Sequence, residues 1–173
     1  PPPPFSCPAH HRHLHLVLRR QRQMCIRDSP ELLAIDTETD SLDYMSAKLI
    51  GISMSVKPNS AAYIPLGHDY LGAPEQLDKE IVLNQLRPIL ENPHVKKVGQ
   101  NIKFDISVFR QHGINLCGIS FDTMLESYVI NSIATRHDMD SLASTYLNLA
   151  TTKFTDVAGL SLIHISEPTR LSA

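Results

Sequence analysis

The sequence lacks the features that mark secreted, disulfide-stabilised and membrane-spanning proteins. It has three cysteines in 173 residues and no apolar run long enough to cross a bilayer. Its first segment does not have the charged, apolar and small-residue regions of a secretory signal peptide. Apolar residues nevertheless make up 42% of the chain, which is typical of a globular protein. We therefore expect a protein of the reducing cytoplasm with no membrane partner.

Residues 30–160, which are long enough to form one domain, also lack a strong positive charge. Residues 30–160 contain 10 Lys and Arg against 16 Asp and Glu, whereas residues 1–29 carry five Arg and one Asp. Non-specific binding to duplex DNA needs several cations facing phosphates, so this charge disfavours it. An acidic domain suits a carboxylate-lined metal site that handles a short single strand.

Two carboxylates stand two residues apart at the end of an apolar run. Asp36 and Glu38 follow Leu32–Ile35. Side chains alternate along a strand, so the two acids point to one side while Ile35 and Thr37 point to the other. Two acids this close repel each other unless a cation or a proton lies between them. The spacing therefore predicts a site for a hard cation at the exit of a strand.

A third acid follows a second strand-like run, Val95–Val98. The segment after it is Gly99-Gln100-Asn101-Ile102-Lys103-Phe104-Asp105. In it Asn101 is a favourable helix N-cap, and Asp105 lies one turn into the helix on the same face. This placement predicts that Asp105 points back towards Asp36 and Glu38. The alternative is a first-turn acid that only complements the helix dipole.

Four separated blocks carry a family resemblance: Asp36–Leu42, Gly99–Asp105, Phe121–Tyr128 and Arg136–Ala143. From about residue 31 to residue 159 the chain resembles the 3′–5′ proofreading exonuclease domain of bacterial DNA polymerase I, a family A polymerase. The resemblance implies a DnaQ-like, ribonuclease H-like fold and hydrolysis of the 3′-terminal phosphodiester of single-stranded or mispaired DNA, releasing nucleoside 5′-monophosphates. It also implies a polymerase domain in cis and a location near the bacterial nucleoid.

The resemblance further implies two divalent ions, Mg²⁺ or Mn²⁺, held by Asp36, Glu38 and Asp105. Two such ions roughly 3.5–4 Å apart activate a water and steady the departing 3′ oxygen. Oxygen ligands favour these metals over softer ones. In the family's pattern Asp36 bridges the ions, Glu38 binds the ion that activates water, and Asp105 holds the other.

The same resemblance assigns residues to the unpaired 3′ end. Leu42 would wedge beside the terminal base and Phe154 would stack on it, with core packing as the alternative role for both. Phe104 stands where the family often has Tyr, so the hydrogen bond of that hydroxyl is absent. The expected sugar and phosphate contacts are Gln100, Asn101, Lys103 and Arg136.

The family's third motif, Tyr-x-x-x-Asp, has no counterpart in this sequence. Tyr128 and Tyr146 are followed four places later by Ser132 and Ala150, so neither supplies the fourth carboxylate. We therefore expect a truncated domain whose native sequence ends near Gly159 and whose catalysis is impaired.

Both ends of the chain resemble translated sequencing-adapter DNA. Arg19–Ser29 and Leu160–Arg170 each fit an eleven-residue, in-frame translation of a transposon-based library adapter. Sequence of that origin has not been selected to pack, and it is set aside from fold reasoning. We expect residues 1–29 and 161–173 to be non-native and disordered, and residues 30–160 to be a partial exonuclease domain.

Three other interpretations were weighed. A ribonuclease D-like RNA exonuclease shares the acidic motifs but fits the last two blocks less well. A non-catalytic spacer or single-strand binding module typically loses the carboxylates. A zinc-dependent basic domain would need cysteines and histidines that match no zinc spacing and lie in the adapter-like flank, so we expect no zinc. These residues are Cys7, His10, His11, His13, His15 and Cys25.

The order of apolar runs and turn signals predicts an α/β fold. Strands are expected at 32–35, 49–56, 61–66, 95–98 and 119–121, and helices at 74–92, 101–112, 122–133 and from 138 onward. Short links make the first three strands antiparallel neighbours. The result is a ribonuclease H-like mixed sheet, with three antiparallel strands and then alternating helix and strand, flanked by helices and incomplete at its C-terminal end.

Overall fold

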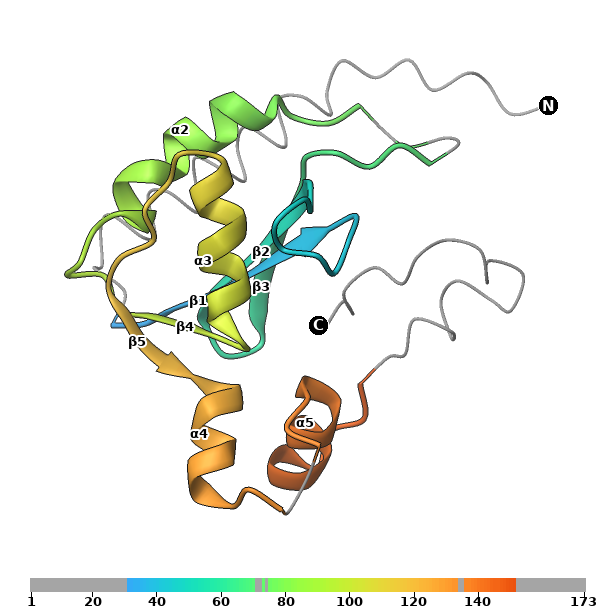
Figure 1. Ribbon diagram of the computed structural model, residues 1–173, viewed down its shortest axis with the longest axis vertical. Helices are drawn as coiled ribbons and strands as arrows, with labels where there is room; N and C mark the ends of the chain where they lie inside the picture. Colours follow the sequence, from blue (N-terminus) through green and yellow to red (C-terminus); the bar gives the residue numbers. More distant parts are fainter. Residues whose placement is uncertain (1–30, 71–72, 74, 134–135, 152–173) are drawn as a thin grey trace.

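A computed structural model describes residues 31–70, 73, 75–133 and 136–151 (Figure 1). The expectations for residues 1–29 and 161–173, and for Phe154, lie outside these residues. The elements in chain order are β1 (Leu33–Thr39), β2 (Leu49–Lys57), β3 (Ser60–Pro65), α2 (Lys79–Leu90), β4 (Lys97–Gly99), α3 (Ile102–Gln111), β5 (Ile119–Asp122), α4 (Thr123–Ile130) and α5 (Met139–Leu147).

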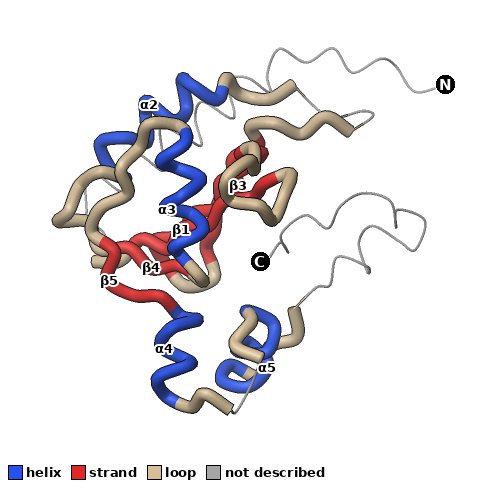
Figure 2. Tube along the Cα trace, in the orientation of Figure 1, coloured by secondary structure: helices blue, strands red, loops and turns tan. Residues whose placement is uncertain are grey.

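One five-stranded mixed sheet organises these elements, in the order β3-β2-β1-β4-β5. β1, β2 and β3 are antiparallel neighbours, whereas β4 runs parallel to β1 and β5 runs parallel to β4. Figure 2 shows α3 crossing the sheet, α2 beside it, and α4 and α5 set apart at the end of β5. The predicted mixed sheet with flanking helices is confirmed.

The core lies between the sheet and the two helices α2 and α3. β1 alternates along its length, with Leu33, Ile35 and Thr37 buried on the core side. Both helices carry an apolar stripe that packs against this side of the sheet, as expected for helices that cover a sheet. The buried members of these stripes are Val82, Leu83, Leu86, Ile89 and Leu90 in α2, and Ile102, Val108 and Phe109 in α3.

Several predicted boundaries differ by a few residues, and two of these differences have a clear local cause. α2 begins at Lys79 rather than at the predicted residue 74, because the Asp78 carboxylate caps it by accepting a 3.0 Å hydrogen bond from the Ile81 N–H. Ile81, in the first turn of α2, is 54% exposed. β1 continues to Thr39 because β2 pairs with it throughout, so the two acids lie within the strand rather than beyond it.

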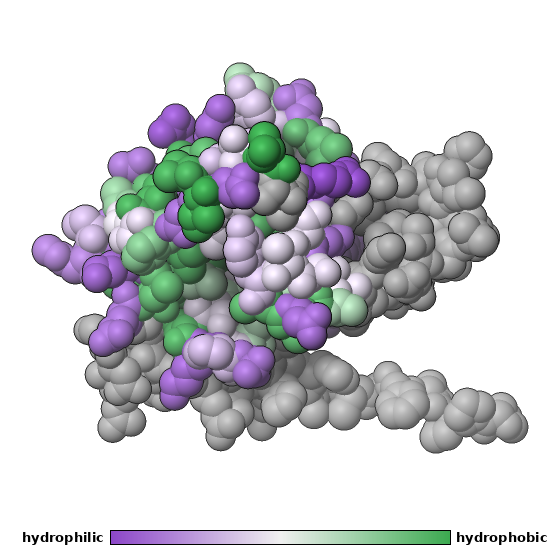
Figure 3. Space-filling model, turned by 90° about the horizontal axis from the view of Figure 1, so that it is seen from below, coloured by the Kyte–Doolittle hydropathy of each residue, from purple (hydrophilic) through white to green (hydrophobic). Residues whose placement is uncertain are grey.

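The α4–α5 end of the domain exposes many apolar side chains (Figure 3). α5 has no buried residue, and in α4 only Ser127 is buried. His137, in the connection between the two helices, is anchored to α4, because its ring stacks on Tyr128 at 3.8 Å and its Nδ1 lies 2.8 Å from the Ser127 hydroxyl. Specific polar and ring contacts, more than core burial, hold this end together. No helix among the described residues is long and apolar enough to span a membrane.

A buried lysine organises the turn that leads into β4. Lys97 is 0% exposed, and its Nζ donates 2.9 Å hydrogen bonds to the carbonyls of Asn92 and Val95. Burial lowers its pKa to about 8. Gly118 closes over the same carbonyls with a left-handed φ of 75°, and its own carbonyl accepts from the Lys97 N–H at 2.8 Å. This contact joins β4 to the start of β5.

Two glycine substitutions test this turn. A Cβ at Gly118 would lie 2.4 Å from the Val95 carbonyl oxygen, whereas a Cβ at Gly113, which also has a positive φ, would meet nothing within 4 Å. Gly113→Ala should therefore lower the free energy of unfolding by only about 1–2 kcal/mol of backbone strain. Gly118→Ala should lower it by clearly more. Urea unfolding measures both, and equal losses would contradict the packing of the turn.

Candidate active site

The two acids of β1 share one face of the sheet. In the β1–β2 ladder Asp36 pairs with Ser53 and Glu38 pairs with Gly51, while Thr37 pairs with Ile52 on the core face. Directly opposite residues of an antiparallel pair point the same way. The predicted alternation is confirmed, and Glu38 is only 4% exposed.

Asp105 reaches β1 through Thr37. Its Oδ1 accepts hydrogen bonds from the Thr37 backbone N–H at 2.8 Å and from the Thr37 hydroxyl at 2.6 Å, across 68 residues of sequence. β4 pairs with β1 only as far as Ala34, so beyond that point a side chain of α3 takes up the strand's hydrogen bonding. Asp105 is 2% exposed, which makes it a buried carboxylate with two donors on one oxygen.

Burial raises the pKa values of all three carboxylates, and neighbouring charge adds to the rise for Glu38 and Asp105. Burial raises the pKa of Asp36 to about 6, against the opposing effect of the Thr37 backbone. Burial raises the pKa of Glu38 to about 7, and the charges of Asp36 and Asp105 add to the rise. Burial and the Asp36 charge raise the pKa of Asp105 to about 7 although the Thr37 hydrogen bonds lower it. A cluster of acids with raised pKa values is typical of a functional site.

One atom of this cluster fits a cation. Glu38 Oε1 is buried and has no hydrogen-bond partner among the described residues. A buried carboxylate oxygen without a partner is costly, and a hard cation is one of the few groups that satisfy it. Within the described part of the chain, however, no three acidic, histidine or cysteine side chains take up a metal-holding arrangement. Thr37 engages one oxygen of Asp105, and the expected set of three carboxylate ligands remains a prediction.

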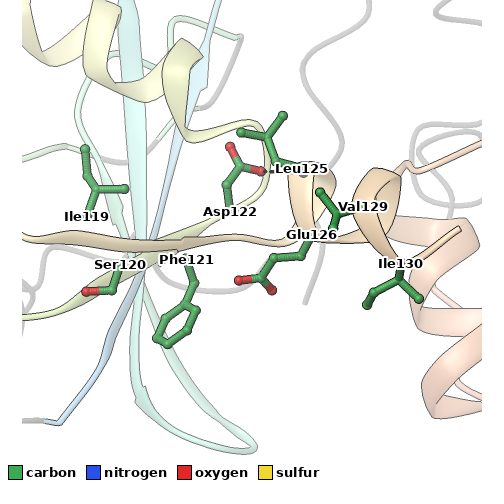
Figure 4. A pocket seen from close by; sticks show the side chains of 8 residues that line it. All are labelled: Ile119, Ser120, Phe121, Asp122, Leu125, Glu126, Val129 and Ile130. Carbon is green, nitrogen blue, oxygen red and sulfur yellow. Dashed lines mark hydrogen bonds between the residues drawn. The ribbon is translucent and has the colours of Figure 1, made fainter. Parts of the chain in front are cut away.

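Asp122 positions the segment before Asp105. Its carboxylate accepts hydrogen bonds from the N–H groups of Asn101 (3.1 Å) and Ile102 (3.0 Å) at the start of α3. It also accepts from Met124 and Leu125 at the start of α4, as Figure 4 shows for Leu125. The expectation that Asn101 caps α3 is wrong: Asn101 has a left-handed φ of 56° and makes no side-chain cap, because Asp122 has taken that role.

Comparison with known proteins identifies this arrangement. Residues 22–166 match the family model described as 3′–5′ exonuclease. The chain is 53% identical over 134 residues to DNA polymerase I of Pseudomonas aeruginosa, covering 76% of this chain and 15% of that protein. It is 38% identical over 145 residues to DNA polymerase I of Rhizobium leguminosarum, covering 74% of this chain and 14% of that protein.

The chain belongs to the 3′–5′ exonuclease family of DNA polymerase I. Solved structures agree with this fold. Escherichia coli RNase D superimposes with a TM-score of 0.54 at 17% identity, covering 80% of this chain and 32% of that one. A structure titled as the apo form of a nuclease gives a TM-score of 0.60 at 21% identity, covering 78% and 59%. The resemblance inferred from the four blocks is confirmed.

Two of the residues expected to contact nucleic acid are already engaged within this exonuclease domain. The Gln100 side chain donates to the His137 carbonyl at 2.7 Å and accepts a short hydrogen bond from the Thr123 hydroxyl. Arg136 pairs with Asp138 at 3.5 Å, although its side chain is 84% exposed. Gln100 therefore ties the link between β4 and α3 to the α4–α5 connection and to α4, and its contact with a nucleotide remains a prediction.

The other expected contacts differ in exposure. Leu42 is 64% exposed, and Asn101 and Lys103 are exposed as well. Phe104 is half-buried and packs against the core. The role of each towards a DNA end remains a prediction.

The sequence pattern does not indicate the roles of three buried polar residues, Thr37, Asp122 and His137, which hold the site and the α4–α5 end in place. Their partners lie 68, 21 and 10 residues away or are backbone groups, and no local pattern reports such contacts. The one available signal was an acid directly before a helical pattern, which fits Asp122 as a cap of α4.

Removing the charge of Asp105 should stabilise the fold at high pH. Its pKa rises from an ordinary 3.8 to about 7 in the fold, so the folded state disfavours the ionised form and stability is lost as the pH rises from about 4 through 7. Asp105→Asn keeps an oxygen for Thr37. It should raise the melting temperature by at least about 4 °C at pH 8 and leave it nearly unchanged at pH 4. Asp69→Asn, at an exposed acid, is the control. A lower melting temperature at pH 8 would contradict the assignment.

Proposed function

We propose that this chain hydrolyses the 3′-terminal phosphodiester of single-stranded or mispaired DNA and releases nucleoside 5′-monophosphates. The observation that supports this proposal most directly is the group formed by the half-buried Asp36 and the buried Glu38 and Asp105, whose pKa values are all raised. Family membership supports the same reaction.

Asp36, Glu38 and Asp105 are the residues that would hold two divalent ions, Mg²⁺ or Mn²⁺. When bound, the ions supply a water of lowered pKa and charge stabilisation for the departing 3′ oxygen. The unpaired Glu38 Oε1 supports this role. A structural neighbour, NrnC from Brucella melitensis, has a structure titled with bound Mg²⁺ at a TM-score of 0.54 and 20% identity, covering 70% of this chain and 56% of that one. The Thr37 hydrogen bonds use only Oδ1 of Asp105, so Oδ2 remains for such a cation.

The exposed side chains around the acids suit a single strand rather than a duplex. Leu42 offers an apolar surface for the terminal base, and Asn101, Lys103 and Arg136 offer donors for phosphates. Phe104 packs against the core and is half-buried, and Phe154 is assigned to the terminal base by the family pattern alone. The acidic balance of residues 30–160 supports a substrate held at few phosphates.

The alternatives are weaker on specific grounds. The ribonuclease D likeness is structural and at 17% identity, whereas relatives above 35% identity are DNA polymerases. A non-catalytic module has no use for three buried acids with raised pKa. Since the chain spans about 15% of the polymerase it resembles, we infer a polymerase domain in cis and a place in the bacterial cytoplasm near the nucleoid.

Digestion of labelled oligonucleotides tests the reaction. With a 5′-labelled single strand and Mg²⁺ or Mn²⁺, the chain should produce a ladder that shortens from the 3′ end. Asp36→Ala should lower the rate of digestion about a hundredfold, because a displacement of the reacting groups by about an ångström has an effect of this size. Asp69→Ala is the surface control. Faster digestion of RNA than of DNA would favour the ribonuclease D-like alternative, and an unchanged rate in Asp36→Ala would contradict the proposal.

A second comparison tests the role of the Tyr-x-x-x-Asp motif that the sequence lacks. A chimaera that joins this chain at Gly159 to a relative's segment carrying the motif should digest DNA far faster, because it adds a fourth carboxylate and a Tyr that orients the water. Adding the same segment with its Asp changed to Ala should give a much smaller gain. Equal rates for the chain and the chimaera would show that three carboxylates suffice.

A further inference from the structure

The hydroxyl of Tyr63 lies on the face of the sheet that carries Asp36 and Glu38. Tyr63 of β3 pairs with Ser53 of β2, which pairs with Asp36 of β1, so the three side chains point the same way. A Cβ at Gly51 would lie 2.0 Å from the Tyr63 hydroxyl oxygen. The hydroxyl therefore fills the space over Gly51, and Gly51 is the residue directly opposite Glu38.

His68 holds that hydroxyl in place. The His68 Nε2 lies 2.6 Å from the Tyr63 hydroxyl, and the two rings pack with centroids 5.8 Å apart. His68 is itself fixed by Gln76, which accepts from its backbone N–H at 2.8 Å and donates to its carbonyl at 2.6 Å. Tyr70 packs on the far side of His68 at 5.9 Å. The phenol is thus oriented by a chain of contacts that does not involve β1.

Glu38 lacks the partner that this hydroxyl offers. Its Oε1 is buried without a hydrogen bond among the described residues. The negative charge of Glu38 is close enough to Tyr63 to add to the rise of the Tyr63 pKa to about 12, which burial mainly causes. When the His68 Nε2–H donates to the phenol oxygen, the phenol proton is left to be donated elsewhere. Glu38, opposite Gly51 on this face, is the carboxylate whose charge acts on Tyr63.

We propose that Tyr63, oriented by His68, is a positioning residue for Glu38, whose carboxylate it restrains for cation binding by donating a hydrogen bond. The proposal rests on the proposed function and adds a residue pair on β3 and the following loop to it. Gly51 takes part by leaving room for the phenol. Partners that orient a metal-binding carboxylate typically change metal affinity about 10–100-fold when they are removed.

Binding of Mn²⁺ to the 173-residue chain, followed by the electron paramagnetic resonance signal of the free ion, tests this role without requiring catalysis. Tyr63→Phe keeps the ring and removes the hydroxyl, and it should weaken Mn²⁺ binding about tenfold. Tyr70→Phe, which alters a ring of the same cluster, should change binding less than about twofold. The melting temperature without metal should stay the same in both variants.

A double-mutant cycle separates positioning from mere packing. His68→Phe keeps a ring but leaves the Tyr63 hydroxyl without its partner, and it should also weaken Mn²⁺ binding. Because His68 acts through Tyr63, the double variant should bind no more weakly than Tyr63→Phe alone. Additive losses would indicate separate structural effects and would overturn the proposal. If Tyr63→Phe lowers the melting temperature, the test rests on His68→Phe alone. Unchanged Mn²⁺ binding in His68→Phe would then overturn the proposal.

Glu38→Gln distinguishes this inference from the proposed function. If Glu38→Gln weakens Mn²⁺ binding and Tyr63→Phe does not, the positioning role is wrong and the metal site stands. If Glu38→Gln leaves binding unchanged, the metal site itself is wrong. Loss in both variants, with Tyr70→Phe unaffected, is the expected result.

Discussion

The contact between Thr37 and Asp105 determines how the rest of the site is arranged. It joins the central strand to the first turn of α3, at the point where β4 no longer pairs with β1. Without it the buried Asp105 carboxylate would lose both of its Thr37 donors, which is unfavourable. With it, an acid from the second motif is held beside the acids of the first, and α3 has a fixed place on the sheet.

This arrangement stores electrostatic repulsion. Burial raises the pKa values of Asp36, Glu38 and Asp105, and the charge of Asp36 adds to the rise for Glu38 and Asp105. A structural core gains nothing from such a group, whereas a cation site needs it, because the cation replaces the lost solvation. Two further residues fix groups around this site: Asp122 holds the backbone before α3, and His68 holds the Tyr63 hydroxyl on the face of the sheet that carries Glu38.

Much of the fold follows from local pattern, and much of the site from the acids alone. Strand alternation places Asp36 and Glu38 together and Thr37 opposite, and the order of apolar runs gives the mixed sheet. The errors arise where a distant group overrides a local preference. Asn is a favourable N-cap residue, but at the start of α3 the Asp122 carboxylate accepts the hydrogen bonds of the Asn101 and Ile102 N–H groups instead. Gln100 is a polar residue beside the motif, yet its amide is used inside the protein. Tyr63 and His68 carry no signal at all, because their importance depends on the register of β2 and β3.

Proton release on cation binding tests the central claim most directly. If Asp36, Glu38 and Asp105 form a cation site with pKa values of about 6 to 7, Mn²⁺ must displace protons from them near neutral pH. Calorimetric titrations at pH 6.5 in two buffers of different ionisation enthalpy measure the number of protons released. The account predicts a release of about one proton or more at pH 6.5 and much less at pH 8.5. Binding with no proton release at pH 6.5 would contradict it.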